Sequence, residues 1–323
     1  MDTKISDAQA NDDSIQTEQP PEALFLVVAY LPLFELLAMS QVCRSLRDAV
    51  NKDVLAWLNL IVEKPLNARL SDDLLLKFTS KSNGRLTTLA LMNCENITDN
   101  GLQRVVEKNP HISKIFIPAC TGLTPDGIIR AVQMLQKHNY NLVSLKMRGI
   151  YNVKKEHLKE LQSILKTNMR CQGMMQQRQH RVYYHGCENL TKLGIEETNC
   201  PIDLDICPKC DLVRMVFDCP KKKCEEKRQK GVRECRGCYH CLPRCAGCGE
   251  CLNEAEEPEE GACNWMDVFC LDCWLQLPKC NFCNKACCKQ HAGECCSLPS
   301  SSGFICYACH EEYVLNSEFG AIL

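Results

Sequence analysis

Cysteine is the residue that most constrains this chain, because it is abundant and unevenly placed. Five of the 27 cysteines lie in residues 1–199, and the other 22 lie between Cys200 and the C-terminus. Eight pairs with the spacing Cys-x-x-Cys occur between Cys207 and Cys309. Two thiolates at this spacing on a tight turn can share one metal ion, and a second pair completes a tetrahedral site. We therefore expect residues 200–323 to form a small module that folds around zinc.

The distances between these pairs predict three zinc sites of four cysteines each. The segments between successive pairs are 24, 21 and 22 residues long, slightly wider than the most familiar zinc spacing. The simplest grouping is Cys207, Cys210, Cys235 and Cys238; Cys245, Cys248, Cys270 and Cys273; and Cys280, Cys283, Cys306 and Cys309. Helix-like sequences follow Cys273 and Cys309, which is the layout of a treble-clef finger.

Parts of this grouping remain open. The first pair can instead close by itself as a zinc hairpin around the strand-like segment 212–217. The ligands of that hairpin would be Cys207, Cys210, Cys219 and Cys224. The simplest grouping also leaves out Cys241 and Cys251, enough with other residues for one or two further ions. The best further group is Cys287, His291 and Cys295.

Structural zinc is favoured over the other roles of clustered cysteines. The sequence from Met1 to Lys4 lacks the features of a secretory signal, so we do not expect a disulfide scaffold. A catalytic zinc site keeps an open position among its ligands, whereas these spacings predict closed four-cysteine sites. A catalytic pair such as Cys288 with His291 is a minor alternative. Cys43, Cys94 and Cys120 are expected to be small buried apolar residues.

Charge and hydropathy disfavour nucleic acids and membranes as partners. The net charge of the chain is −2, and from Cys200 onward 14 Lys and Arg residues face 19 Asp and Glu residues, a formal charge of −5. An acidic module is unfavourable for contacts with nucleic-acid phosphates. The longest uncharged apolar run, residues 23–34, has 12 residues, fewer than the roughly 20 that a membrane span needs. We expect a soluble protein that does not bind membranes.

The first part of the chain divides into a tail and a helical bundle. Residues 1–18 carry five acidic residues against the single base Lys4 and few bulky apolar residues, so we expect a disordered tail. In residues 19–57, apolar residues recur at offsets of three, four and seven, which predicts helices with one apolar face. Pro32 divides this pattern, so the helices are expected to be short.

Residues 58–165 contain a repeat of about four units. Motifs typical of helix starts, most with Ser or Thr and an acidic residue, recur at intervals of 27, 26 and 30 residues. They begin at Leu70, Ile97, Leu123 and, more loosely, Val153. Apolar residues alternate before each motif, and the clearest strands are expected at Leu89–Leu91, Ile115–Ile117 and Leu145–Met147. Strand, turn and helix at this period are typical of leucine-rich repeats, so we expect a short solenoid.

Residues 166–199 are expected to be a connector, because their sequence has little periodicity. The basic and aromatic stretch at residues 180–185 is interpreted as a packed segment rather than a partner strand.

Residues 19–57 resemble an F-box without a gap. The residues at the usual positions of that family are Pro20, Glu22, Leu24, Leu31, Leu36, Leu37, Val42 and Cys43. Gln19 and Leu46 depart from it, since Leu and Trp are common there. Together with the repeats and the cysteine-rich tail that begins Ile206-Cys207-Pro208-Lys209-Cys210, the chain resembles plant F-box proteins of the Skp-interacting-partner type.

The resemblance implies a non-catalytic subunit of an SCF-type ubiquitin ligase in the nucleus, the cytoplasm or both. The helical bundle would bind the Skp adaptor, and through it the cullin, while the repeats or the zinc module bind an unidentified protein substrate. The implied adaptor-binding residues are Pro20, Leu24, Leu31, Pro32, Leu36, Leu37, Val42, Cys43, Leu46 and Trp57. The predicted fold class is α+β multidomain: a helical F-box bundle, a short leucine-rich-repeat solenoid and a small zinc-stabilised C-terminal module of treble-clef or ribbon type.

Three alternatives remain. The helical bundle can be a cap that only protects the first repeat. Direct ligase activity through a RING is disfavoured, because the loop from Cys283 to Cys288 is too short and Cys295 and Cys296 are adjacent where a RING needs a spaced pair. Nucleic-acid binding by the zinc module rests on one basic cluster, at residues 221–230, within an acidic region.

Overall fold

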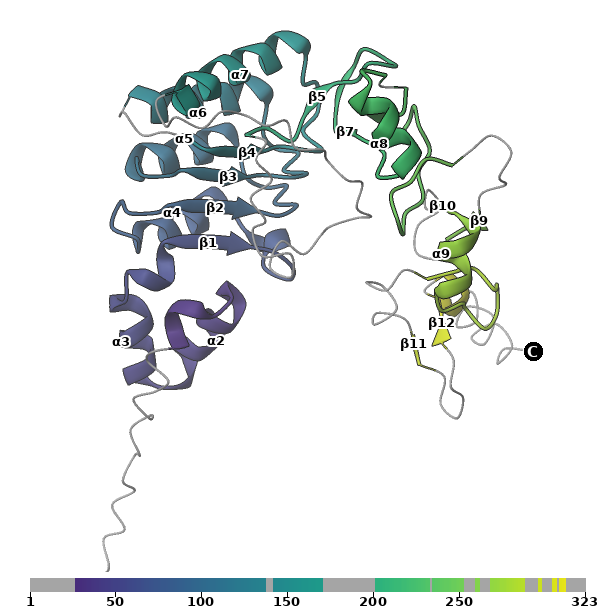
Figure 1. Cartoon of the computed structure of the whole chain (residues 1–323). Helices are drawn as coiled ribbons and strands as arrows, with labels where there is room; N and C mark the ends of the chain where they lie inside the picture. Colours follow the sequence, from purple (N-terminus) through teal and green to yellow (C-terminus); the bar gives the residue numbers. More distant parts are fainter. Residues whose placement is uncertain are drawn as a thin grey trace, which may run out of the picture.

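The computed structural model describes residues 27–137, 142–170, 201–232, 234–252, 259–261, 268–287, 296–297, 304–306 and 308–311. The expected tail and most of the expected connector lie outside these residues. Figure 1 shows an N-terminal helical region, a stack of strands and helices, and a C-terminal region of short elements. None of the helices in the described residues combines the length and the apolar content needed to span a membrane.

The N-terminal helical region, residues 27–57, consists of short helices that end where the sequence breaks the helical pattern. Its elements are η1 (Val28–Tyr30), α2 (Leu33–Val42), α3 (Arg44–Lys52) and η2 (Leu55–Trp57). Pro32 immediately precedes α2, where its missing N–H costs no helical hydrogen bond. Cys43 has an extended backbone, and this residue separates α2 from α3.

Four strands form one parallel sheet in the order β1-β2-β3-β4. They are β1 (Asn59–Val62), β2 (Thr88–Leu91), β3 (Lys114–Phe116) and β4 (Ser144–Lys146). The 3-10 turn η3 (Asn67–Arg69) and the helices α4 (Asp72–Ser80), α5 (Asp99–Lys108), α6 (Pro125–Lys137) and α7 (Lys155–Arg170) follow the strands in turn. Each unit is therefore a strand followed by a helix, and Figure 1 shows the helices stacked beside the sheet.

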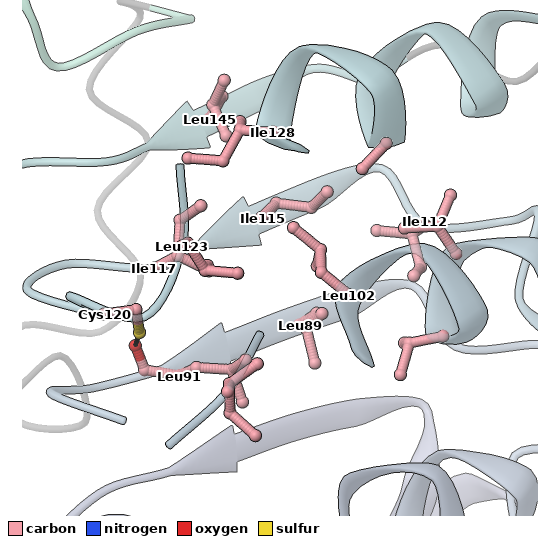
Figure 2. Close-up of a cluster of buried hydrophobic side chains, with 14 of the residues drawn as sticks. Leu89, Leu91, Leu102, Ile112, Ile115, Ile117, Cys120, Leu123, Ile128 and Leu145 are labelled. Atoms are coloured by element: carbon pink, nitrogen blue, oxygen red, sulfur yellow. Dashed lines mark hydrogen bonds between the residues drawn. The ribbon is translucent and has the colours of Figure 1, made fainter. Parts of the chain in front are cut away.

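The alternating apolar residues of the strands form the core of this stack. Leu89 pairs with Ile115, which pairs with Leu145, so the strands expected around these residues lie in one sheet. All three side chains are almost completely buried, together with Leu102 and other residues of the facing helices (Figure 2). The prediction of successive strand–helix units that share one core is thus confirmed. The last helix, α7, continues to Arg170, beyond the expected end of the repeats at residue 165.

The cysteines of the repeats are buried, as expected. Cys94 and Cys120 are inaccessible to solvent, and Cys120 Sγ donates a hydrogen bond to Leu91 O at 3.2 Å (Figure 2). A hydrogen bond that the Cys94 thiol donates to Cys120, together with burial, holds the pKa of the Cys94 thiol far above its usual value. Both residues are packing residues of the stack.

An aspartate at the start of one helix holds the start of the next helix in the stack. Asp72 accepts hydrogen bonds from the backbone N–H and the hydroxyl of Thr98, at 3.0 and 2.6 Å. Asp99 accepts the same two bonds from Thr124, at 2.8 and 2.6 Å. Thr98 also caps its own helix, because its hydroxyl accepts the backbone N–H of Gly101 at 3.3 Å. The recurrence of Thr and Asp in the repeat therefore has two causes, helix capping and contact between units.

The fourth unit replaces this arrangement with a histidine. His157 Nδ1 accepts the backbone N–H of Lys154 at 3.1 Å, and its Nε2 lies 3.6 Å from Asp126 Oδ1. His157 thus contacts both its own helix start and the preceding unit, which explains why the fourth motif matches the others only loosely.

Gly101→Ala is expected to destabilise the stack by about 2 kcal/mol, as overpacking typically does. A Cβ atom at this position would lie 2.0 Å from Asp72 Oδ1. Urea unfolding of the full chain would measure the effect, and Asn100→Ala, at an exposed position of the same helix, is the matched control. Asp72→Ala removes the obstructing carboxylate, so the double variant should lose less stability than the sum of the single variants. Strict additivity would contradict this explanation.

The segment that follows residue 200 joins the last strand of the sheet. Leu145 N–H donates to Pro201 O at 2.6 Å, and Leu145 forms a parallel bridge with Ile202. The Asp203 carboxylate accepts the backbone N–H groups of Met147 and the next residue, at 2.8 and 3.0 Å. Ile202 is buried in the same core as the repeats. The C-terminal region therefore covers the β4 end of the stack, while the helical region precedes β1.

The C-terminal region contains small two-stranded antiparallel sheets and short helices. The paired strands are β5 (Asp205–Ile206) with β6 (Val213–Arg214), β7 (Val216–Phe217) with β8 (Gly237–Cys238), β9 (Glu259–Glu260) with β10 (Val268–Phe269), and β11 (Cys296–Ser297) with β12 (Phe304–Ile305). The helices are α8 (Lys222–Gln229) and α9 (Leu271–Gln276). Elements this short have little apolar surface to bury, so cysteines make up much of the buried interior.

Candidate metal centres and candidate docking surface

Four groups of four cysteines each lie close enough together to bind a metal ion. In every group the four sulfur atoms lie within 4.8 Å of one another. Site 1 is Cys207, Cys210, Cys238 and Cys241; site 2 is Cys219, Cys224, Cys235 and Cys251; site 3 is Cys245, Cys248, Cys270 and Cys273; and site 4 is Cys280, Cys283, Cys306 and Cys309.

Sites 3 and 4 are the groups that the sequence predicted, whereas sites 1 and 2 differ from both predicted arrangements. Site 1 takes Cys241 in place of the predicted Cys235, and Cys235 belongs to site 2. The zinc hairpin was also wrong, because Cys219 and Cys224 do not join the first pair. The residues from Cys235 to Cys241 form two overlapping Cys-x-x-Cys pairs, and spacing alone cannot decide which pair shares a turn. In the structure the N–H of Cys241 bonds to the Cys238 carbonyl at 3.1 Å, which closes the turn at the second pair.

Sites 1 and 2 are interleaved along the chain. Three ligands of site 2 lie between the two pairs of site 1, and the fourth, Cys251, follows the first pair of site 3. Hydrogen bonds within each site join its distant parts. Cys207 Sγ accepts the backbone N–H of Cys238 at 3.3 Å, and Cys219 Sγ accepts that of Cys251 at 3.3 Å. Neither site can therefore form from one local loop of the chain.

The first pairs of sites 1, 3 and 4 share one backbone conformation. The residues that directly follow them, Asp211, Gly249 and Asn284, have φ values of 60°, 74° and 57°. Asp, Gly and Asn are the residue types that tolerate this left-handed region best. Their N–H groups bond to the carbonyl of the first cysteine of each pair at 2.8–2.9 Å. Asp, Gly or Asn after Cys-x-x-Cys is thus a sequence signal that distinguishes these three pairs from the others.

The second pairs of sites 3 and 4 stand at the start of a helical turn. Cys270 directly precedes α9, and its carbonyl accepts the N–H of Trp274 at 2.9 Å. Cys306 O accepts the N–H of His310 at 2.9 Å in the same way. In both sites the first pair, an antiparallel strand pair and this turn follow one another along the chain, which is the order expected of a treble-clef finger.

The distances between sulfur atoms fit a tetrahedral zinc ion. Zinc–sulfur bonds of about 2.3 Å place neighbouring sulfurs about 3.8 Å apart. The Sγ atoms of Cys210 and Cys238 in site 1 and those of Cys283 and Cys306 in site 4 are 3.8 Å apart. The corresponding distances are 3.4–3.9 Å in site 2 and 3.9 Å in site 3. All four groups therefore have the dimensions and the donor atoms of a closed structural zinc site.

Each site contains one cysteine whose pKa is lowered, which favours its thiolate form. Burial raises the pKa of the Cys207 thiol, but N–H donors from Cys210, Cys238 and Lys209 outweigh burial and lower the pKa to about 6. The pKa of Cys280 is lowered to about 6 by backbone donors in the same way. Elsewhere in the sites, hydrogen bonding to Cys210 and burial raise the pKa of Cys241 to about 12. Four neighbouring thiolates repel one another, and a divalent cation is the group that removes this repulsion.

The additional ligand group predicted from the sequence is only partly described. Cys287 is buried and belongs to none of the four sites, and His291 and Cys295 lie outside the described residues.

The N-terminal helical region exposes large apolar side chains. Tyr30 is 86% exposed, Phe34 is 53% exposed and Val42 is 73% exposed. Phe34 and Val42 belong to α2, and Tyr30 precedes it. Large exposed apolar side chains within so short a stretch of chain are candidates for contact with another protein. We call these three residues the α2 surface.

Comparison with known proteins identifies this surface as part of an F-box. The F-box domain family matches residues 20–58, and the At3g27290 F-box protein C-terminal domain family matches residues 203–282. The F-box protein SKIP28 of Arabidopsis thaliana is 42% identical over 299 residues, which cover 90% of this chain and 89% of that protein. The chain belongs to the F-box protein family. F-box protein SKIP14 of the same plant is 34% identical over 246 residues, which cover 76% of this chain and 52% of that protein. F-box protein At3g27290 of the same plant is 36% identical over 239 residues, which cover 73% of this chain and 61% of that protein.

The ends of the two family matches can be compared with the structural regions of this F-box protein. The N-terminal match contains the whole helical region that the structure describes. The C-terminal match contains every ligand of sites 1, 2 and 3, but it ends between Cys280 and Cys283 of site 4.

The residues predicted to bind an adaptor differ in how deeply they are buried within the F-box. Leu36, Leu46 and Trp57 are buried in the free chain, so they support the helices and do not form an exposed surface. The half-buried residues are Leu31, Leu37 and Cys43; the exposed ones are Pro32 and Val42; and Pro20 and Leu24 lie outside the described residues. Periodicity could not separate these groups, because α2 carries apolar residues on nearly every side. Tyr30 and Phe34 are exposed residues that the sequence analysis missed.

Proposed function

We propose that this F-box protein is the substrate-recruiting, non-catalytic subunit of an SCF-type ubiquitin ligase in the nucleus, the cytoplasm or both. The observation that carries the proposal is the exposed α2 surface within the F-box match. The adaptor of the Skp class would bind this surface and connect the protein to a cullin. The names of the relatives SKIP28 and SKIP14 are consistent with this role.

The remainder of the chain supports a role in binding a protein substrate. The strand–helix units have the period and the contacts expected of leucine-rich repeats, and the four cysteine groups fit structural zinc. Closed four-cysteine sites leave no open position for a reacting water, so the metal would stabilise the fold and not take part in chemistry. Along the chain the helical region precedes β1 and the cysteine module follows β4, so the stack joins the adaptor surface to a candidate substrate module.

Substitution of the α2 surface is expected to abolish adaptor binding. Truncation of a large apolar residue at the centre of an interface typically costs about 2 kcal/mol, or about 30-fold in Kd. Phe34→Ala and Val42→Ala should each weaken binding of a purified Skp adaptor in a titration, and the double variant should bind below detection. Tyr151→Ala, which removes an exposed aromatic ring from the repeats, is the matched control.

Undiminished adaptor binding by the folded double variant would refute the assignment of this surface. These exposed residues test the proposal better than Leu36 does, because Leu36 is 1% exposed and its truncation would also unfold the helices.

Direct ligase activity through a RING is a second candidate, favoured by the interleaving of sites 1 and 2. Its ligand order differs from a RING's, because Cys219, Cys224 and Cys235 of site 2 all precede the second pair of site 1. Ubiquitin transfer from a charged conjugating enzyme in the absence of adaptor and cullin would support the RING, whereas transfer only in the complete complex would support the adaptor role.

A further inference from the structure

Arg244 is a fully buried cation without a carboxylate partner among the described residues. Its exposed fraction is 0%. Its Nη2 donates to the carbonyl of Phe217 at 3.2 Å and to that of Cys235. Within the part of the chain that the structure describes, Nε and Nη1 have no hydrogen-bond partner. A buried charge without a counter-charge is strongly destabilising, so a negative group is required nearby.

Arg236, in the same module, has the carboxylate partners that usually accompany a poorly exposed arginine. Its two terminal nitrogens contact Asp218 Oδ2 at 2.6 Å and Asp205 Oδ2 at 2.8 Å. Its charge is therefore neutralised by carboxylates. Arg244 is more deeply buried than Arg236 but lacks such a partner in the described residues.

The position of Arg244 identifies the missing negative group. Arg244 forms an antiparallel bridge with Cys251, and residues paired in this way direct their side chains to the same face, with Cβ atoms about 5 Å apart. Its hydrogen bond to the Cys235 carbonyl reaches a second ligand of site 2. The residue that follows it, Cys245, is the first ligand of site 3. The guanidinium thus lies beside site 2 and next in the chain to site 3.

We propose that Arg244 is the internal counter-cation of the metal module and retains zinc at site 2. The inference rests on the proposed zinc binding. A zinc ion with four thiolates carries two net negative charges, because four anionic ligands outweigh one divalent cation. The buried guanidinium offsets this charge, and the charge of the site in turn stabilises the guanidinium. Zinc binding at site 2 and the burial of Arg244 therefore depend on each other.

A hydrogen bond to the backbone of a metal-binding cysteine is not sufficient to give an arginine the role that we propose for Arg244. Arg228 Nη1 donates to the Cys219 carbonyl at 3.2 Å, and Cys219 is also a ligand of site 2. Arg228, however, has a carboxylate neighbour, Glu225, at 3.9 Å. Arg228 thus shares the hydrogen bond with Arg244 but not the uncompensated charge, which makes it the matched control.

The test is zinc release from the purified full chain to the chromophoric chelator 4-(2-pyridylazo)resorcinol, with zinc per chain counted by native mass spectrometry. Arg244→Met, which keeps the apolar stem, should release one zinc ion about tenfold faster than the unsubstituted protein, the usual minimum effect of groups that support metal ligands. Arg244→Lys should be intermediate, because it retains the charge. Arg228→Met should release zinc at the unsubstituted rate.

Labelling with N-ethylmaleimide after partial release would locate the lost ion. Preferential labelling of Cys219, Cys224 and Cys251 is expected, whereas preferential labelling of Cys280 and Cys283 in site 4 would overturn the assignment. Equal release from the Lys and Met variants would show that Arg244 acts through packing and would also overturn the proposal. Absence of zinc from the unsubstituted protein would refute metal binding itself, a result distinct from a failure confined to Arg244.

Discussion

Removal of zinc is expected to unfold the C-terminal module and to leave the strand–helix stack folded. The three buried clusters that the structure describes in this module are small, and half of their buried members are themselves cysteines of the four sites. A single large cluster, by contrast, extends from Val28 through the stack to Leu204. Structural zinc sites contribute about 10–16 kcal/mol of apparent binding free energy at neutral pH, and this free energy stabilises the fold. The strand–helix stack contains no cysteine of the four sites, so its stability should not depend on zinc.

Hydrogen exchange of the full chain, with and without a strong chelator under reducing conditions, would measure this difference. Protection should be lost at the amides that pair β7 with β8 and retained at those that pair β2 with β3. Residues 201–204 should also stay protected, because Ile202 and Leu204 belong to the core of the stack. Re-addition of zinc is the control for reversibility.

Elemental analysis should find four zinc ions per chain, one for each cysteine group. Three ions would match the number in the simplest grouping of the sequence. A module that keeps its exchange protection without metal would refute the role of zinc in its folding.

The strand–helix stack could be predicted from the sequence because its signals are local. Leu89, Ile115 and Leu145 each lie in an alternating stretch, and a capping motif follows at a nearly constant distance. The contacts between units could not be derived in this way. Gly101 shows why, since its role depends on Asp72 in the preceding unit and not on its own helix.

The metal sites were predictable only where the ligands follow one another along the chain. Sites 3 and 4 are each built from two successive pairs, so spacing was sufficient. Sites 1 and 2 are interleaved, and the pairing of β7 with β8, rather than the distance in sequence, places Cys238 beside Cys207. Arg244 had no sequence signal, because its importance arises from burial.

Trp57→Ala is expected to destabilise the protein by about 4 kcal/mol, within the usual range for truncation of a buried tryptophan. The side chain is 1% exposed and connects the F-box to the first strand–helix unit. Its Nε1 donates to Val50 O at 2.8 Å, and its ring stacks on Phe78 with the centroids 6.2 Å apart. Lys81 Nζ lies 4.1 Å from the centroid of the same ring. Trp57 was predicted to contact the adaptor, but in this structure it faces the repeats.

Two variants separate the contributions of this residue. Trp57→Phe keeps a ring beside Phe78 but leaves the buried carbonyl of Val50 unpaired, so a loss of about 1–3 kcal/mol is expected. Lys81→Met removes the cation above the ring, which is worth about 1 kcal/mol, together with the exposed hydrogen bond from Lys81 Nζ to Asn51 Oδ1 at 3.0 Å. Urea unfolding followed by separate probes in the F-box and in the repeats would give these values, and Trp57→Ala should also split one transition into two.

A single transition with a loss below about 1 kcal/mol, far less than a buried tryptophan contributes, would show that the F-box does not depend on Trp57. If the transitions separate, Trp57 is the residue that holds the α2 surface at a constant position relative to the stack, and therefore relative to any substrate bound beyond it.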